Sequence, residues 1–434
     1  WVKQTGYPVV DVQTARSGDT VKITAAQNRF TYDRLVEPEG SDDTLWYVPL
    51  GVSLAGSDSQ ASQMMESRTA LMRVAVPTGV SDEAWIKVNP DQTGFYRVNY
   101  SPEDWARLRS AIQGLELPPT DRLGIQNDAY ALSKSGLLPV TEFLALAEAY
   151  TDETDATVWS DLASNLGGLD SVLAQEAYYA GFEAFARRIF QPVGQRAGWA
   201  AKPGEGHLDS LLRSTVLREL GGYGDEDALA KASELFEEYL EDPANVHPDI
   251  RGVVFSLAAK RGDRSTYDKM WELYQGAQME EEKTRFLGSL TNFERPELLD
   301  ESLKRSLSDD VRTHDTIRVV GGVASNRLGR DRAWEFVKDN WAEFDRRYGE
   351  GGFALMRLVS ITSRFTTQDK MDDVQAFFKS HPAPSAERTI QQSLERVRLN
   401  IAWLEQNGEE LAGWFVGWGS GLCPGTSGYV SSPG

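Results

Sequence analysis

The sequence has 434 residues, with 45 Lys plus Arg, 65 Asp plus Glu, four His and one Cys. The net charge of −20 argues against a nucleic-acid partner or a membrane surface, because both need clustered basic side chains. The single cysteine, Cys423, cannot form an internal disulfide, which excludes a disulfide-stapled secreted scaffold and favours a cytoplasmic location. No apolar run approaches the length of a transmembrane helix.

Residues 1–98 predict a small β-sandwich. Short segments rich in β-branched and aromatic residues are bounded there by Gly, Pro, Asp and Ser. The predicted strands are residues 9–12, 20–24, 45–50, 70–76, 84–88 and 94–98. The last two flank a turn-rich loop at residues 89–93 and predict a hairpin. About six short strands at this spacing are typical of a sandwich.

Residues 99–412 predict an all-α solenoid of the HEAT or armadillo kind. Ser101 followed by Pro102 is typical of a helix start. From there the apolar residues repeat with a helical period, as in Trp334, Val337, Trp341, Phe344 and Tyr348. About a dozen or more short helices over this length are too many for one bundle and favour a stack of helix pairs with a concave face.

Residues 413–434 form a third region with a different composition. They contain seven Gly, two Pro and no charged residue, and the helical period stops near Leu411. We expect this tail to be disordered or artefactual. Cys423 lies in it without a nearby His, so a catalytic thiol is not predicted.

The histidines argue against a zinc site within this chain. A zinc hydrolase of the H-E-x-x-H type needs two His one helical turn apart. His207, His247, His314 and His381 are isolated, and none is followed by Glu. No catalytic residue and no metal ligand is therefore predicted.

One break in the helical pattern, at residues 191–213, has two interpretations. Gly and Pro interrupt the period for over a dozen residues before a helix resumes. The break is either a ligand-facing loop or a plain connection between helices, and the pattern alone does not separate them.

Several blocks resemble the aminopeptidase N family, and most closely its puromycin-sensitive branch. The end of the sandwich is similar at Trp85-Ile86-Lys87-Val88-Asn89 and Gly94-Phe95-Tyr96-Arg97-Val98-Asn99-Tyr100. The opening of the helical domain is similar at Leu117-Pro118-Pro119-Thr120-Asp121-Arg122. The branch is indicated by Lys202-Pro203-Gly204-Glu205-Gly206-His207 and by His381-Pro382-Ala383-Pro384-Ser385-Ala386. The similar blocks extend from Trp1 to about Leu411 in the family's order.

The resemblance implies a parent enzyme that is a zinc aminopeptidase and hydrolyses N-terminal residues from peptides. The family's H-E-x-x-H and G-x-M-E-N motifs do not occur in this sequence, so the chain resembles the non-catalytic C-terminal half. That half caps the active site and shapes the peptide cavity, with the N-terminal catalytic domain and peptides as partners. Basic residues of this domain can attract a peptide's carboxylate, and the candidates here are Arg213, Arg285 and Arg122.

A freestanding scaffold is the alternative function. An acidic solenoid joined to a β-module could bind basic or extended proteins without any catalysis. The chain does not begin with Met, from which we expect a fragment or a processed product and disfavour the scaffold.

Overall fold

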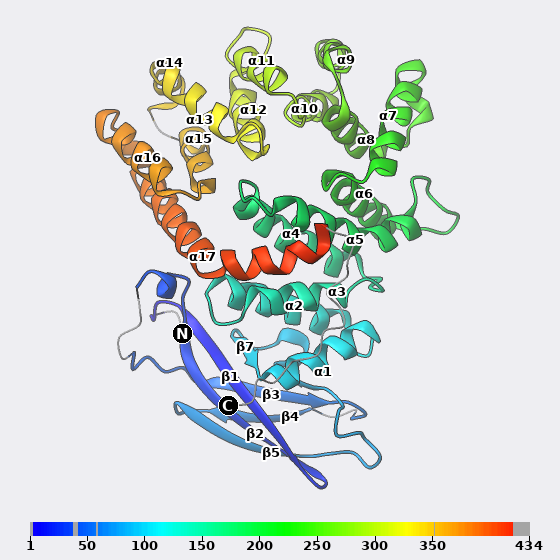
Figure 1. Cartoon of the computed structure of the whole chain (residues 1–434), viewed down its shortest axis with the longest axis vertical. Helices are drawn as coiled ribbons and strands as arrows, with labels where there is room; N and C mark the ends of the chain where they lie inside the picture. Colours follow the sequence, from blue (N-terminus) through cyan, green and yellow to red (C-terminus); the bar gives the residue numbers. More distant parts are fainter. Residues whose placement is uncertain (1–2, 38–41, 58–59, 351, 420–434) are drawn as a thin grey trace. The chain divides into compact units, whose positions relative to one another are not determined.

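The computed structural model describes residues 3–37, 42–57, 60–350 and 352–419. In these residues seven β-strands are followed by seventeen α-helices (Figure 1). The predicted fold class, a sandwich-like β-module followed by a helical array, is therefore confirmed. The chain divides into two compact units, of which the first comprises Trp1–Asn165 with Glu405–Leu411 and the second Leu166–Leu404 with Ala412–Gly434.

Two small sheets make up the β-module of the first unit. Their strand orders are β5-β2-β1-β7 and β4-β3-β6. The strands are β1 (Tyr7–Ser17), β2 (Thr20–Phe30), β3 (Val48–Leu54), β4 (Ala61–Met65), β5 (Thr69–Ala75), β6 (Ile86–Val88) and β7 (Arg97–Tyr100). In β2, Val21, Ile23 and Ala25 are buried while Lys22 and Thr24 are exposed, which is the period-2 pattern of a strand covered on one face.

The predicted hairpin at residues 84–98 is wrong, because its two strands belong to different sheets. Val88 of β6 pairs with Val52 of β3, whereas Val98 of β7 pairs in parallel with Val10 of β1. Asn89 explains the change of direction. It adopts a left-handed conformation with φ 59°, and its side chain accepts a hydrogen bond from the N–H of Gly94 at 2.7 Å.

A buried charge network joins the sheets to α2 (Pro119–Lys134) within the first unit. The Lys87 ammonium donates to two main-chain carbonyls at 2.6 and 2.9 Å and lies 3.7 Å from Asp121. Asp128 accepts from a main-chain N–H of β7 at 3.1 Å and from Arg97 at 3.2 Å. Burial raises the pKa of Asp128 to about 6, because a buried carboxylate loses its hydration.

The helical part starts at the predicted N-cap. The Ser101 Oγ accepts a hydrogen bond from the N–H of Asp104 at 3.2 Å at the start of α1 (Pro102–Gln113). The change from strand to helix thus falls close to residue 98, although the predicted division into three domains stays a prediction. The helices after α2 are α3 (Val140–Glu148), α4 (Ala156–Leu173), α5 (Tyr179–Ala197), α6 (His207–Gly222), α7 (Glu226–Glu241), α8 (Pro248–Arg261), α9 (Arg264–Gly276), α10 (Glu280–Ser289), α11 (Pro296–Ser306), α12 (Thr313–Ser325), α13 (Arg330–Asp339), α14 (Trp341–Tyr348), α15 (Phe353–Ser360), α16 (Gln368–Ser380) and α17 (Glu387–Gly419).

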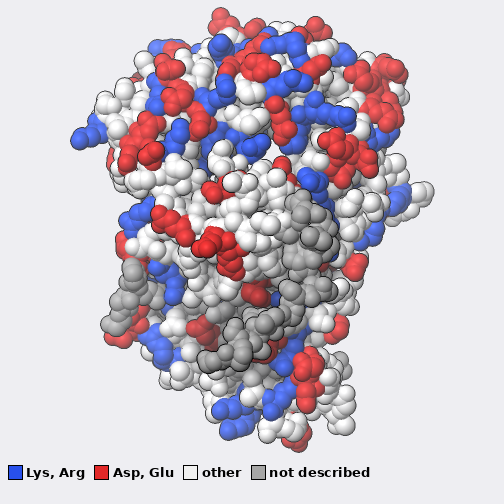
Figure 2. Space-filling model, viewed as in Figure 1, with Lys and Arg blue, Asp and Glu red and all other residues white. Residues whose placement is uncertain are grey.

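The second unit stacks its helices in pairs. Each of α6, α8, α10 and α12 packs against the helix that precedes it in the chain. In addition, α6 packs against α8, α8 against α10, and α10 against α12, so these four helices form a row, which we call the first row. This is the contact pattern of a solenoid, in which each pair completes its core only against its neighbours. The helices α7, α9, α11 and α13 form a second row, which ion pairs cross-link, for example Lys269 to Glu237 at 3.1 Å and Arg332 to Asp300. In the space-filling view, acidic and basic side chains accordingly alternate over these helices (Figure 2).

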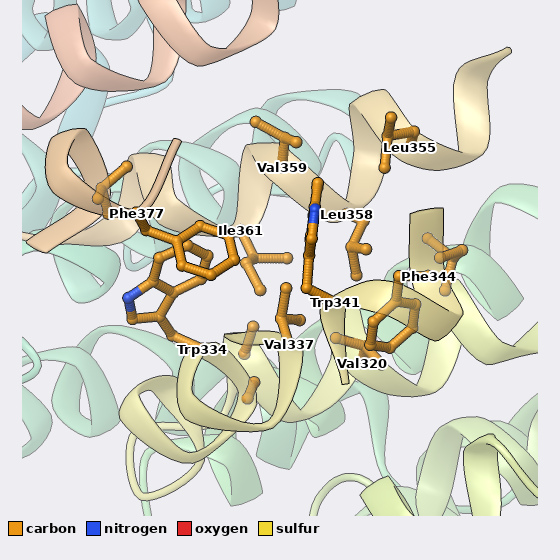
Figure 3. Packing of buried hydrophobic residues seen from close by; sticks show 14 of the residues in the cluster. Val320, Trp334, Val337, Trp341, Phe344, Leu355, Leu358, Val359, Ile361 and Phe377 are labelled. Carbon is orange, nitrogen blue, oxygen red and sulfur yellow. The ribbon is translucent and has the colours of Figure 1, made fainter. Parts of the chain in front are cut away.

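A large apolar cluster fills the end of the array between α13, α14, α15 and α16 (Figure 3). The predicted periodic residues Trp334, Val337, Trp341, Phe344 and Tyr348 are all buried in it. They do not share one helix, because α13 ends at Asp339 and α14 begins at Trp341. The regular spacing of these apolar residues predicted correctly that they are buried, but it did not indicate the break between the two helices.

The predicted start of the irregular tail at Gly413 is too early, because α17 continues as a helix to Gly419. Phe415 is 1% exposed and packs against the rings of Tyr178, Phe182 and Phe185 of the second unit. The burial of the Phe415 side chain stabilises the last turns of α17, although they contain several glycines. The rest of the predicted tail, with Cys423, lies outside the described residues.

We expect Phe415→Ala to lower the free energy of unfolding of the second unit by about 3–5 kcal/mol, because it leaves a cavity among three aromatic rings. Val416→Ala is the matched control, since Val416 is 71% exposed, and should change it by less than about 0.5 kcal/mol. Urea unfolding of both variants measures the difference. Equal stability of the two variants would show that the end of α17 does not contribute to the core.

The raised pKa of Asp128 predicts a pH-dependent stability. Between about pH 4 and pH 6 the folded chain keeps a proton on Asp128 that the unfolded chain has lost, so this group stabilises less as the pH rises. Relative to the unmodified chain, Asp128→Asn should therefore gain up to about 3 kcal/mol between pH 4 and pH 7. Urea unfolding at several pH values, with Asp19→Asn in the exposed β1–β2 turn as control, tests this. A difference that stays constant with pH contradicts it.

Candidate functional site

A polar cavity of about 280 Å³ lies within the second unit. Its walls come from the last turns of α4, α6, α8 and α12, the first turn of α5, and the segment after α10. Four acidic and three basic side chains line it. Residues more than 150 positions apart, from Gly167 to Arg327, meet in this one place because the helices stack in register.

Close packing of α6 against α8 shapes one wall of the cavity. A Cβ atom at Gly221 would lie 2.5 Å from the Cδ1 of Leu257, so a larger residue at this crossing requires the Leu257 side chain to shift. The next residues, Gly222 and Tyr223, line the cavity where α6 ends. Gly221 and Gly222 are thus the last residues of α6, and Tyr223 and Gly224 form the turn to α7.

Asp170 and Tyr179 form a short hydrogen-bonded pair in the cavity wall. The Tyr179 hydroxyl donates to Asp170 Oδ1 at 2.6 Å. Burial raises the pKa of Asp170, while this hydrogen bond and the more distant Arg330 and Arg364 act in the opposite direction. The Asp170 carboxylate is thus held in place by its tyrosine.

Glu219 and Glu183 also line the cavity, from α6 and α5. Burial raises the pKa of Glu219 to about 7 and also raises that of Glu183. Neither carboxylate has a hydrogen bond or an ion pair with any residue that the structure describes. Near neutral pH, Glu219 is therefore part protonated and part ionised in the ligand-free chain.

Two of the three basic residues of the cavity already have protein partners. The Lys260 ammonium forms an ion pair with Glu294. The Arg327 guanidinium lies 5.4 Å from the centre of the Tyr179 ring, which is a cation–π distance. Arg218 is exposed, so water screens its charge.

The arginines predicted to bind a carboxylate lie elsewhere. Arg122 belongs to the first unit, is 5% exposed, and forms a bidentate ion pair with Glu153 at 2.6 and 2.7 Å. Arg213 is 2% exposed and contacts Glu205 and the carbonyl oxygen of Gly198 at 3.1 Å. Both guanidinium groups are therefore held by groups of the protein itself.

Arg285 is the most accessible of the three, with a side chain that is 26% exposed. It forms an ion pair with Glu281 one helical turn earlier in α10, which is the pattern of a surface pair. None of the three arginines lines the cavity. Their predicted role in binding a carboxylate stays a prediction.

The predicted break at residues 191–213 is shorter than the sequence indicated. α5 continues through Pro192 to Ala197, and the connection to α6 occupies only residues 198–206. An ion pair between Arg213 and Glu205 anchors this connection to α6. The geometry fits an anchored inter-helix connection, which was one of the two interpretations.

No three His, Cys, Asp or Glu side chains come close enough to hold a metal ion in the part of the chain that the structure describes. Over the same residues, no helix is both long enough and apolar enough to cross a membrane.

Comparisons with known proteins agree with this architecture. The family model of the ERAP1-like C-terminal domain matches residues 85–399. Aminopeptidase M1 of Arabidopsis thaliana is 31% identical over 424 residues, covering 93% of this chain and 47% of the relative. Aminopeptidase 2 of Candida albicans is 28% identical, over 95% of this chain and 44% of the relative. Glutamyl aminopeptidase of Bos taurus is also 28% identical, over 96% of this chain and 43% of the relative.

The chain thus spans less than half the length of these curated relatives, while each match covers nearly all of the chain. The family match alone includes all helices from α1 to α16. From these findings, the chain belongs to the ERAP1-like C-terminal domain family and corresponds to the C-terminal region of an aminopeptidase.

Proposed function

We propose that this chain is the non-catalytic C-terminal part of a zinc-dependent aminopeptidase and shapes the cavity that receives the peptide. The observation that carries the proposal is the coverage: the match takes in 93% of this chain but only 47% of the Arabidopsis relative. The remaining half of the relative has no counterpart in this sequence. The whole enzyme would hydrolyse N-terminal residues from peptides, with the N-terminal catalytic domain as the partner of this chain.

The described residues of this chain offer no set of ligands for the zinc ion that such an enzyme needs. Its four histidines are far apart in sequence, and the described residues contain no cluster of metal-binding side chains. We therefore assign no step of the hydrolysis to this chain, and place the zinc with the catalytic domain. A cytoplasmic location is part of the same proposal and rests on the single cysteine.

The second unit supports a role in holding a peptide. A stack of helix pairs presents a long surface made of successive turns, which suits an extended ligand. The cavity between these helices is lined mainly by charged, amide, hydroxyl and phenolic side chains, with Leu257 as the one aliphatic side chain among the described residues that line it, so a polar ligand group could replace water there.

We expect the chain alone to bind no stoichiometric zinc and to release no product from leucine p-nitroanilide. Elemental analysis and a colorimetric assay measure both quantities. Stoichiometric zinc, or turnover that a chelator abolishes, would contradict the non-catalytic assignment.

A chimera tests the peptide-shaping role. We expect Arabidopsis aminopeptidase M1, with its matched C-terminal part replaced by this chain, to keep at least about a tenth of its kcat/KM for leucine p-nitroanilide, since the catalytic groups are untouched. For peptides of ten residues, kcat/KM should change relative to the parent enzyme. A folded chimera with unchanged peptide selectivity would instead support the freestanding scaffold.

The three arginines can be separated in the same chimera. Arg285→Ala should raise KM about 3–10-fold for peptides with a free C-terminal carboxylate and leave KM unchanged for the same peptides amidated. Arg122→Ala should instead lower the free energy of unfolding by about 3–5 kcal/mol, because it leaves Glu153 buried without a partner. If Arg285→Ala affects free and amidated peptides equally, Arg285 does not bind the carboxylate.

A further inference from the structure

The cavity of the second unit lies at the negative ends of several helices. The last turns of α4, α6, α8 and α12 contribute Asp170, Gly222, Lys260 and Ser325 to its wall, whereas only α5 begins there. The carbonyl groups in the last turn of a helix carry a partial negative charge. Four helix C-termini and one helix N-terminus therefore give the cavity a negative electrostatic bias, even without the charges of its side chains.

The side chains of the cavity add to this bias, because four carboxylates face three cations there. One of these cations, the exposed Arg218, attracts the Glu219 carboxylate without forming a hydrogen bond or ion pair with it. Lys260 is paired with Glu294, and Arg327 covers the ring of Tyr179. The carboxylates of Glu219 and Glu183 have no partner among the described residues. Both side chains are half-buried, so their carboxylate oxygens are partly open to water and have no donor from the protein, which leaves them available as acceptors for a ligand.

Tyr223 is a second and independent indication of a binding site. Its side chain lines the cavity and is 5% exposed, yet its hydroxyl makes no hydrogen bond with any described residue. The ring is held by an edge contact with Phe182 and by stacking on Phe190, with centroids 5.8 and 6.1 Å away. The hydroxyl is therefore fixed in position and free to accept a hydrogen bond.

We propose that this cavity binds an organic cation, a protonated amine or a guanidinium group, with Glu219, Glu183 and the Tyr223 hydroxyl as acceptors. An ammonium group offers three N–H donors and a guanidinium group five, and these donors match the three acceptors in the cavity wall that have no donor from the protein. A volume of about 280 Å³ admits such a group with a short aliphatic stem. An anion would find Arg218 as the one lining cation without a partner among the described residues, and the Glu219 and Glu183 carboxylates and the helix ends would repel it.

This inference does not depend on the proposed function, since it concerns binding by the chain alone. The group could come from a free amine or from a basic side chain of a peptide, and these sources share one chemistry. Agmatine, which carries a guanidinium and an amine, serves as the small probe. Acetylated and amidated Ala-Ala-Arg-Ala-Ala serves as the peptide, with citrulline in place of arginine as its neutral isostere.

Isothermal titration calorimetry of the full chain tests the proposal. We expect agmatine to bind, neutral N-butylurea to bind at least tenfold more weakly, and acetate not to compete with agmatine. Glu219→Gln should weaken agmatine binding at least tenfold, and Tyr223→Phe about threefold. Glu272→Gln removes the same charge from an exposed position of α9 and should leave the affinity unchanged.

The two peptides identify the source of the cation. Tight binding of the arginine peptide but not the citrulline peptide would assign the source to a peptide side chain, whereas agmatine binding alone would assign it to free amines.

Several results would overturn the proposal. They are equal binding of agmatine and N-butylurea, unchanged agmatine affinity in the double variant Glu183→Gln plus Glu219→Gln, or binding of acetate in place of agmatine. Thermal unfolding of each variant separates lost binding from lost folding. We expect the glutamine variants to melt no more than a few degrees below the unmodified chain, because glutamine resembles the protonated carboxyl group.

Discussion

In the second unit, a helix pair cannot cover its own apolar face, and this constraint determines most of the structure. The helices α6, α8, α10 and α12 pack against one another as well as against their chain neighbours, so burial is shared along the array. The ion pairs of the second row, such as Lys269 with Glu237, are exposed and each contribute less than about 1 kcal/mol. The apolar packing therefore holds the array together, and the charged side chains of its surface are open to other roles.

The cavity follows from the same stacking. Because the helices of the first row run in register, their ends meet, and carboxylates that are far apart in sequence come to face one space. Water reaches this space poorly enough to raise the pKa of Glu219 to about 7. Such perturbed groups in a concave site are the usual mark of ligand binding, whether the ligand is a substrate or a regulator.

The sequence predicted the order of a β-module and a helical array because period-2 and period-3.6 patterns are local signals, as in β2 and at Trp334. It did not predict that β6 and β7 enter different sheets, since strand pairing depends on distant partners such as Val52 and Val10. The cavity was not predicted for the same reason, because Asp170, Glu219 and Arg327 are far apart in the sequence and share no motif. The three predicted arginines were chosen by sequence context, which does not reveal that Glu153 and Glu205 already occupy two of them.

The glycine at the crossing of α6 and α8 has a consequence for how this domain diverges among relatives. With Leu257 only 2.5 Å from where a methyl group would sit, a larger residue 221 requires the side chain of residue 257 to move or to become smaller. Where the side chain of residue 257 does not give way, an enlargement pushes α6 away from α8 and moves Glu219 and Tyr223 with it. The two positions should therefore vary together in related sequences, and the ligand preference of the cavity should shift wherever that pair has been exchanged.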